Sequence, residues 1–233
     1  MSILAVIPAR GGSKGVKKKN IKDLGGKPLI SYTLETALST DIISDIVVST
    51  DDHDIADYCK KYSEVYVPFL RPKELSTDKS LSAPVVIHAL NFMEAFLEKK
   101  YDLVLMLQPT SPMRKPNHIK ESFNILENGG FDSVVSVVDV DGYHPLRMKT
   151  ISNGKLENFI DQGFEDMRPR QDLPKVYIRN GAIYLIKRES LLKNQSLVSS
   201  KCGGYIMDSC SSVNIDSKND FLMAEILINQ DII

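Results

Sequence analysis

The segment after the first apolar stretch combines glycines with cations, a composition suited to phosphate chemistry. It reads Arg10-Gly11-Gly12-Ser13-Lys14-Gly15. Glycines allow backbone N–H groups to turn toward an anion, and Arg10 and Lys14 add full charges for phosphate oxygens. The spacing matches neither the dinucleotide fingerprint nor the P-loop, so it indicates phosphate binding without specifying either fold. The competing interpretation is a basic turn with solvated side chains.

A lysine run, Lys17-Lys18-Lys19, follows this loop. Such runs are usually solvated, and we expect this of Lys17 and Lys18. Lys19 and Asn20 lie nearest the next element, so they are the candidates to reach a phosphate or a ribose.

Two later segments carry polar side chains that could complete a site. Gln108 opens the sequence QPTSP after an apolar run, where it could hydrogen-bond a sugar or acyl group, although the segment could also be a plain turn. Asn214 and Asp216 would share one side of an extended segment. With phosphate oxygens and water, that pair suits Mg²⁺, which rarely takes a full protein cage. The alternative is that Asp216 only caps the last helix.

Other catalytic patterns find no support. The four histidines have no metal-ligand spacing, and the sequence lacks the Gly-x-Ser-x-Gly elbow of a hydrolase triad.

These residues need elements to position them, and apolar runs rich in Val and Ile alternate with helical patterns. The alternation is typical of an α/β protein with a mainly parallel sheet covered on both faces. The predicted strands are Ile3–Ile7, Ile46–Ser49, Val65–Val67, Leu103–Leu107, Ser133–Val138 and Ala182–Ile186. The predicted helices are Leu29–Leu38, Asp54–Tyr62, Ala83–Lys99, His118–Leu126 and Asp216–Asn229. Ligands bind such sheets at the carboxyl ends of the strands, where both Arg10 and Gln108 would lie.

Residues 143–178 interrupt this alternation. Asn153-Gly154 predicts a hairpin turn between Met148–Ser152 and Lys155–Ile160, and a stretch rich in Pro and Arg follows. We interpret the segment as an excursion from a single domain spanning residues 1–233. It could mediate oligomer contacts or form a surface flap.

Composition limits the classes of partner and the cellular location that we expect for the protein. The formal net charge of -1 argues against a general binder of nucleic acid or membrane surfaces. The three cysteines lack CxxC spacing, which favours reduced cytosolic thiols. The apolar start, Ser2 to Pro8, is too short for a signal peptide or membrane span, so a cytoplasmic location is expected.

Taken together, the motifs resemble the acylneuraminate cytidylyltransferases, the CMP-sialic acid synthetases. IPARGGSKG, KKKNI, GGKPLI, VSTDD, LRPKELSTD, LQPTSP, RNGAIY and SVNIDSKNDF occur in family order from Ile7 to Phe221. The resemblance implies a Rossmann-like nucleotidyltransferase fold with a mostly parallel mixed sheet. It also implies a reaction in which CTP and a nine-carbon 2-keto sugar acid give the CMP-sugar and pyrophosphate with Mg²⁺, by in-line attack of the anomeric hydroxyl on the α-phosphorus.

The resemblance also assigns roles to residues, and it makes Arg10, Lys14 and Asp216 the catalytic set. The nucleotide would be held by Arg10, Gly11, Ser13, Lys14, Lys19, Asn20, Arg71 and Ser82. The sugar acid would meet Gln108, Arg147, Arg170, Asn180 and Tyr184. Residues 143–178 resemble the family's dimerisation element, so Arg147 would serve the neighbouring subunit of a homodimer.

One departure from the family concerns the metal, since many members carry Asp-x-Asp where this chain has Asn214-Ile215-Asp216. An amide offers an oxygen but no negative charge, so Mg²⁺ should depend more on Asp216 and the phosphates. Two alternatives stay open. The acceptor could be legionaminic, pseudaminic or an eight-carbon sugar acid, or the protein could bind nucleotide without catalysis.

Overall fold

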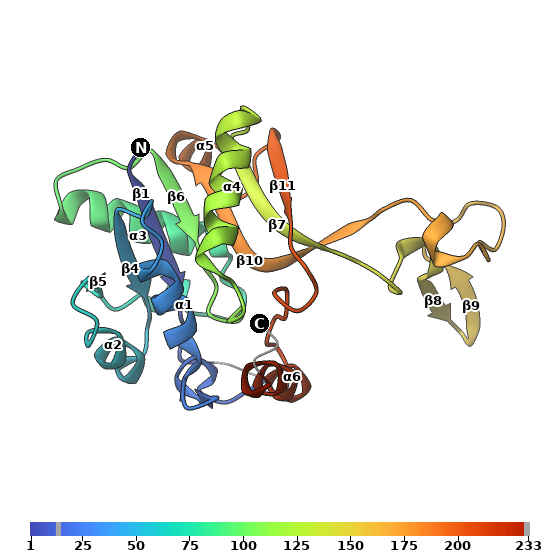
Figure 1. Cartoon of the computed structure of the whole chain (residues 1–233), viewed down its shortest axis with the longest axis horizontal. Helices are drawn as coiled ribbons and strands as arrows, with labels where there is room; N and C mark the ends of the chain where they lie inside the picture. The colour runs from blue at the N-terminus through green and yellow to red at the C-terminus, as the bar shows by residue number, and fades with distance from the viewer. Residues whose placement is uncertain (13–14, 231–233) are drawn as a thin grey trace.

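A mixed seven-stranded sheet forms the centre of the protein (Figure 1). The computed structural model describes residues 1–12 and 15–230. In spatial order the strands are β11 (Cys202–Ile206), β7 (Ser133–Asp139), β10 (Tyr177–Lys187), β6 (Leu103–Met106), β1 (Ile3–Pro8), β4 (Asp45–Ser49) and β5 (Val65–Tyr66). Only β10 among these strands runs antiparallel to its neighbours, β6 and β7. The predicted mostly parallel mixed sheet is confirmed.

Helices cover both faces of the sheet, as predicted. Successive strand residues point to opposite faces, so Ile3, Ala5 and Ile7 of β1 join one buried cluster while Leu4 and Val6 join the other. The first cluster includes residues of α1 (Leu29–Leu38), α2 (His53–Cys59) and α4 (Pro116–Asn128). The second includes residues of α3 (Ser82–Phe96) and α5 (Arg188–Asn194). Burial on both faces explains why β1 is apolar throughout.

The long helix α3 packs on the sheet through the predicted face. Val86, Leu90 and Met93 are fully buried, and Leu97, just beyond the helix, packs against the same cluster. Each such side chain contributes roughly 1.5–3 kcal/mol by leaving water. This packing anchors the start of α3, where Ser82 lies beside the predicted site.

The last helix, α6 (Lys218–Asn229), packs against residues from the N-terminal part of the chain. Phe221 and Leu227 of α6 pack with Val16 and Leu29 in a third buried cluster, beside the small hairpin β2 (Asp23–Leu24) and β3 (Lys27–Pro28). Ser217 caps α6 in a capping box with Asp220, because its hydroxyl accepts from the Asp220 N–H. The suggestion that Asp216 caps the helix is therefore wrong; its carboxylate instead contacts Asn214 and Lys19.

Residues 140–176 form an arm that extends away from the sheet between β7 and β10 (Figure 1). The arm contains the hairpin β8 (Lys149–Ser152) and β9 (Lys155–Asn158), and the short 3-10 helices η3 (Pro145–Arg147) and η4 (Arg170–Asp172). Asn153 and Gly154 have positive φ angles of 51° and 78°, as a two-residue hairpin turn requires. The predicted hairpin is confirmed, with both strands slightly shorter than expected.

Some elements differ from the sequence-based boundaries. β10 begins at Tyr177 rather than Ala182, and neither β11 nor α5 was predicted. Among the described residues, no helix is both long enough and apolar enough to cross a membrane.

Candidate active site

A cavity of about 490 Å³ lies where β1 and β6 end and α3 begins. This is the edge at which ligands bind open α/β sheets. The site residues predicted from sequence that line it are Arg10, Lys19, Asn20, Arg71, Ser82, Gln108, Asn214 and Asp216. The fold therefore brings together segments that are two hundred residues apart in the sequence.

In the described part of the N-terminal loop, one backbone N–H is already engaged within the protein. Gly11 donates its N–H to Asp51 Oδ1 at 3.0 Å, because the loop after β4 lies beside the loop after β1. Asn20 is buried and donates its amide to the Arg10 carbonyl at 2.9 Å, so it fixes the loop's backbone. Ser13 and Lys14, both predicted to bind nucleotide, lie outside the described residues.

The cations of the cavity are held by carboxylates and carbonyls. Arg10 Nη1 lies 2.6 Å from Asp78 Oδ1. Lys19 Nζ donates to the Ile215 carbonyl at 2.5 Å and lies 3.3 Å from Asp216 Oδ1. These contacts orient the charges toward one space, and an incoming phosphate would compete with the carboxylates for them.

Arg71 forms a deeper part of the same wall. It is buried and donates to the Ser49 hydroxyl at 3.0 Å and to the Ser49 carbonyl, at the end of β4. Burial lowers the pKa of its guanidinium to about 10, against the opposing attraction of Asp51. Arg71 therefore remains charged at neutral pH. Ser82, the first residue of α3, lies on the same wall, where helix N–H groups face ligands.

A second cavity, of about 390 Å³, shares Gln108 and Asn214 with the first. Its lining also includes Arg179, Asn180 and Tyr184, so two predicted sugar-binding residues, Asn180 and Tyr184, lie in it with Gln108. Sequence analysis overlooked Arg179. Its place in RNGAIY, directly beside Asn180, was the available signal.

The amide of Asn180 is fully engaged inside the protein. Its Oδ1 accepts from the Ser136 hydroxyl at 2.6 Å and the Ala182 N–H at 3.2 Å, and its Nδ2 donates to the Ser212 hydroxyl at 2.9 Å. These bonds hold β10 where its pairing with β7 breaks between Arg179 and Tyr184. In this structure Asn180 shapes the cavity wall through the backbone around it.

The two predicted Mg²⁺ ligands, Asn214 and Asp216, lie in the segment directly before α6. Asn214 Nδ2 donates to Asp216 Oδ2 at 2.6 Å, so the two predicted ligands point toward each other. Asn214 Oδ1 is buried without a hydrogen-bond partner, whereas the Asp216 side chain is 72% exposed. Among the described residues, no group of three or more His, Cys, Asp or Glu could hold a metal. One carboxylate and one unsatisfied amide oxygen are the kind of donors that Mg²⁺ takes beside phosphates and water, and the Asn214 amide must turn for its oxygen to face the same ion as Asp216.

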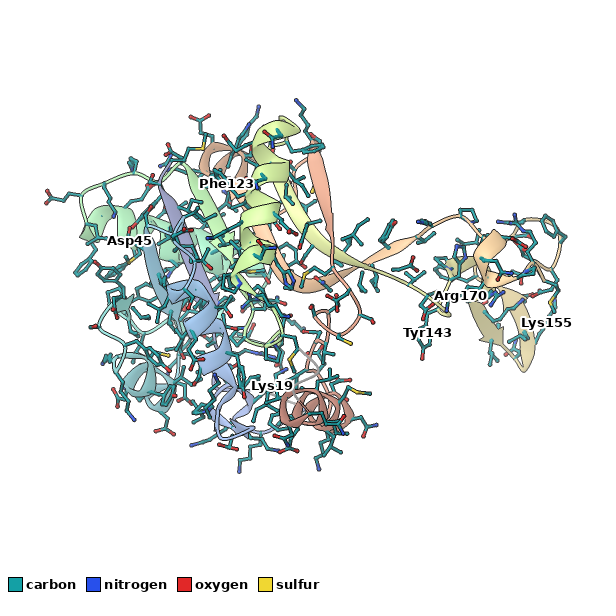
Figure 2. The ribbon with its side chains drawn as sticks, viewed as in Figure 1. Lys19, Asp45, Phe123, Tyr143, Lys155 and Arg170 are labelled. Atoms are coloured by element: carbon teal, nitrogen blue, oxygen red, sulfur yellow. The ribbon has the colours of Figure 1, made fainter. Side chains whose placement is uncertain are left out.

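The arm places the two remaining predicted residues away from these cavities. Arg170 pairs with Asp141, and Arg147 Nη2 donates to the Arg168 carbonyl at 2.8 Å. Figure 2 shows Arg170 with Tyr143 and Lys155 on the arm, well apart from Lys19 beside α6. Neither arginine lines the cavities of its own chain. Both arginines were predicted to bind the sugar acid, and the extended stem of the arm carries them away from the sheet of their own chain.

The cation-lined cavity at the end of β1, with Asp216 beside it and the mixed sheet beneath, has the features that a nucleotidyltransferase needs. The sequence profile of a family described as cytidylyltransferase matches residues 4–197. The CMP-N,N'-diacetyllegionaminic acid synthase of Legionella pneumophila is 38% identical over 99% of both chains. The N-acylneuraminate cytidylyltransferase of Streptococcus agalactiae is 34% identical over 95% of this chain, which spans 52% of that longer protein.

A solved structure supports the fold independently. A CMP:2-keto-3-deoxy-manno-octonic acid synthetase complexed with CTP aligns with a TM-score of 0.72 over 99% of this chain and 100% of that one, at 16% identity. The chain belongs to the acylneuraminate cytidylyltransferase family, and it is a nucleotidyltransferase.

Proposed function

We propose that the protein joins CTP to a nonulosonic acid, giving the CMP-activated sugar acid and pyrophosphate. The observation that supports this most directly is the pair of cavities sharing Gln108 and Asn214. One cavity carries the cations Arg10, Lys19 and Arg71, as a triphosphate needs. The other presents amide, guanidinium and phenol groups, as a polyhydroxy acid needs.

The reaction is a displacement at phosphorus. The anomeric oxygen of the sugar acid forms a bond to the α-phosphorus, the bond from that phosphorus to the bridging oxygen of the β-phosphate breaks, and the hydroxyl proton passes to solvent. Catalysis then depends on positioning and on neutralising charge. Arg10 and Lys19 would bind the triphosphate, and Gln108 would orient the acceptor at the boundary of the cavities.

Asp216 and Asn214 would hold Mg²⁺ together with the phosphates. When bound, the ion would neutralise the negative charge that develops on the phosphate oxygens. Lys19 beside Asp216 would add a second positive charge at the same point.

The second cavity, which we call the acceptor cavity, would be completed by the arm of a second copy of the chain. The exposed side chains of the arm support such a homodimer. A two-stranded hairpin is at best marginally stable alone, and the arm that contains this one exposes large apolar side chains. They include Tyr143, Ile151, Leu156, Phe159, Phe164 and Met167, each between 59% and 82% exposed. Burying them against a second copy would also carry Arg147 and Arg170 toward the partner's sugar carboxylate.

Among possible acceptors, N,N'-diacetyllegionaminic acid deserves the first assay, because the Legionella pneumophila relative matches at 38% over both full lengths. Sialic, pseudaminic and eight-carbon keto sugar acids complete the panel. Each is incubated with CTP and Mg²⁺ while pyrophosphate is followed, and the other nucleoside triphosphates replace CTP in parallel. Release with at least one acceptor is expected. If CTP binds but no acceptor releases pyrophosphate, the protein is a nucleotide-binding member without catalysis.

A further inference from the structure

Arg114 is a buried cation held chiefly by neutral oxygens. It lies in the loop between β6 and α4, and it is 2% exposed. Its Nη1 donates to the Ala182 carbonyl at 2.6 Å and approaches the Gln108 carbonyl at 3.4 Å, while Nη2 donates to the Thr33 hydroxyl at 2.9 Å. Its Nε has no partner, and no carboxylate is among its hydrogen-bond partners in the described residues.

A buried arginine without a counter-charge stabilises the folded protein less than an apolar side chain would. Burying a guanidinium without a counter-charge costs several kcal/mol, and an apolar side chain of similar volume would usually stabilise a core better. What a guanidinium offers instead is a rigid planar set of donors that can bind several carbonyls in a fixed relative position. The segments joined by Arg114 therefore indicate its purpose.

Two of those segments border the acceptor cavity and adjoin each other there. Gln108 opens the loop after β6, and Ala182 lies within the break in β10 pairing between Arg179 and Tyr184. The walls meet closely, since a β-carbon on Gly181 would lie 2.7 Å from Gln108 Oε1. A small shift of either backbone would therefore change the space between them.

We propose that Arg114 is a positioning residue that fixes the Gln108 loop against the residue 180–183 segment of β10 and thereby sets the acceptor end of the active site. This inference rests on the proposed function. Arg114 lines neither cavity, and its shorter bond goes to the Ala182 carbonyl, in the β10 segment that borders the acceptor cavity alone. Its longer contact goes to Gln108, which borders both cavities, so its loss should affect the sugar acid more than CTP.

The test compares Arg114→Met with Arg188→Met. Arg188 is a partly buried arginine bonded to Glu94 on the far side of the sheet, so its replacement controls for the loss of a packed, hydrogen-bonded arginine. In Arg114→Met we expect the KM for the acceptor to rise at least about tenfold, with the CTP dissociation constant changed less than about threefold. Arg188→Met should change neither constant. Arg114→Lys keeps the charge without the planar fork, and it should give an intermediate acceptor KM.

Hydrogen exchange supplies a readout that does not depend on turnover. Amides of residues 108–112 and 180–184 should exchange faster in the Arg114 variants than in Arg188→Met. Equal losses of CTP and acceptor binding, or unchanged exchange in both segments, would overturn the inference, and Arg114→Lys serves if Arg114→Met does not fold. Failure of the wild-type protein to release pyrophosphate with any acceptor would instead count against the proposed function, and the exchange comparison would still decide the role of Arg114.

Discussion

The α-carbon of Gly15 lies directly against the backbone carbonyl of Asp216, so closely that a β-carbon at residue 15 would overlap that oxygen. The relationship joins the end of the phosphate-binding loop to the segment proposed to hold Mg²⁺. Lys19 reinforces the junction, because its ammonium group binds the Ile215 carbonyl beside it. These contacts hold the N-terminal loop and the segment before α6 against each other.

Replacing Gly15 should push the N-terminal loop away from the segment that contains Asp216. We expect Gly15→Ala to lower kcat at least about 100-fold, because displacement of a positioned group by about 1 Å is enough for such a loss. Gly204 is the control, since the nearest neighbour of a β-carbon there is a Val137 methyl at 4.0 Å. Steady-state pyrophosphate release would measure both variants. Comparable activity in Gly15→Ala and Gly204→Ala would contradict the close packing.

The two polar residues of the proposed Mg²⁺ site, Asn214 and Asp216, should contribute unequally to catalysis. Asp216 supplies the only charge of the pair, so Asp216→Ala should abolish turnover. Asn214→Ala should mainly raise the Mg²⁺ concentration needed for half-maximal rate, by about tenfold. Asn214→Asp adds a carboxylate and should tighten Mn²⁺ binding in an electron paramagnetic resonance titration. Equal and small effects of the two alanine variants would argue against this metal assignment.

Strong local patterns in the sequence predicted most of the framework. The helix Leu29–Leu38 was predicted with its observed bounds, and the apolar parallel strands were placed to within a residue or two. β11 was missed because Gly203 and Gly204 are poor strand formers. Gly203 is needed there because a β-carbon would lie 2.7 Å from the Phe131 ring, a contact between distant residues that the local pattern does not encode.

Within the candidate site, the position of a residue could be predicted where it follows a strand, whereas the hydrogen-bond partners of its polar groups could not. Arg10 and Gln108 lie at strand ends, so their convergence followed from topology. The capture of the Gly11 N–H by Asp51, and the use of the Asn180 amide by Ser136 and Ser212, depend on long-range contacts. No spacing rule reveals whether a polar group is already satisfied within the fold.

The acceptor cavity should be sensitive to Gly181. Its φ angle is +79°, a conformation that costs an L-residue roughly 1–2 kcal/mol, and an added β-carbon would press on Gln108 Oε1. We expect Gly181→Ala to raise the acceptor KM with little effect on CTP affinity by calorimetry. Gly204→Ala is the control, because its nearest neighbour, a Val137 methyl, is 4.0 Å from the new carbon. Normal acceptor kinetics in Gly181→Ala would mean that the two walls separate freely.

The arm offers a test of assembly on one face of its hairpin. Ile151 and Leu156 are cross-strand partners, 74% and 61% exposed, so they form one apolar face. We expect the double variant Ile151→Ser with Leu156→Ser to sediment as a monomer and the wild type as a dimer. Thr150 and Glu157 form the neighbouring pair on the opposite face, so Thr150→Ala with Glu157→Gln should stay dimeric. A wild-type monomer at micromolar concentration would refute the proposed dimer.

Glu94, which lies outside the candidate active site, should make the free energy of unfolding depend on pH in the acid range. Burial alone would raise the pKa of this carboxyl, but hydrogen bonds from Arg188, Lys100 and the Tyr101 N–H lower it to about 2. A lowered pKa in the folded protein means that the stabilisation is present above the ordinary Glu value near 4.5 and is lost as pH falls toward 2. We expect Glu94→Gln to reduce the free energy of unfolding at pH 7 by up to about 3 kcal/mol.

That difference should shrink as urea unfolding is repeated from pH 5 downward, because the protonated wild-type carboxyl comes to resemble the neutral amide. Asp57→Asn removes an exposed acid whose ion-pair partner among the described residues is Lys60 on the surface, so it should cost little at any pH. A Glu94→Gln penalty that stayed constant down to the lowest pH at which the protein is folded would show that the loss comes from packing. A penalty that faded with acid would show that the charge on Glu94 holds α3 to the start of α5.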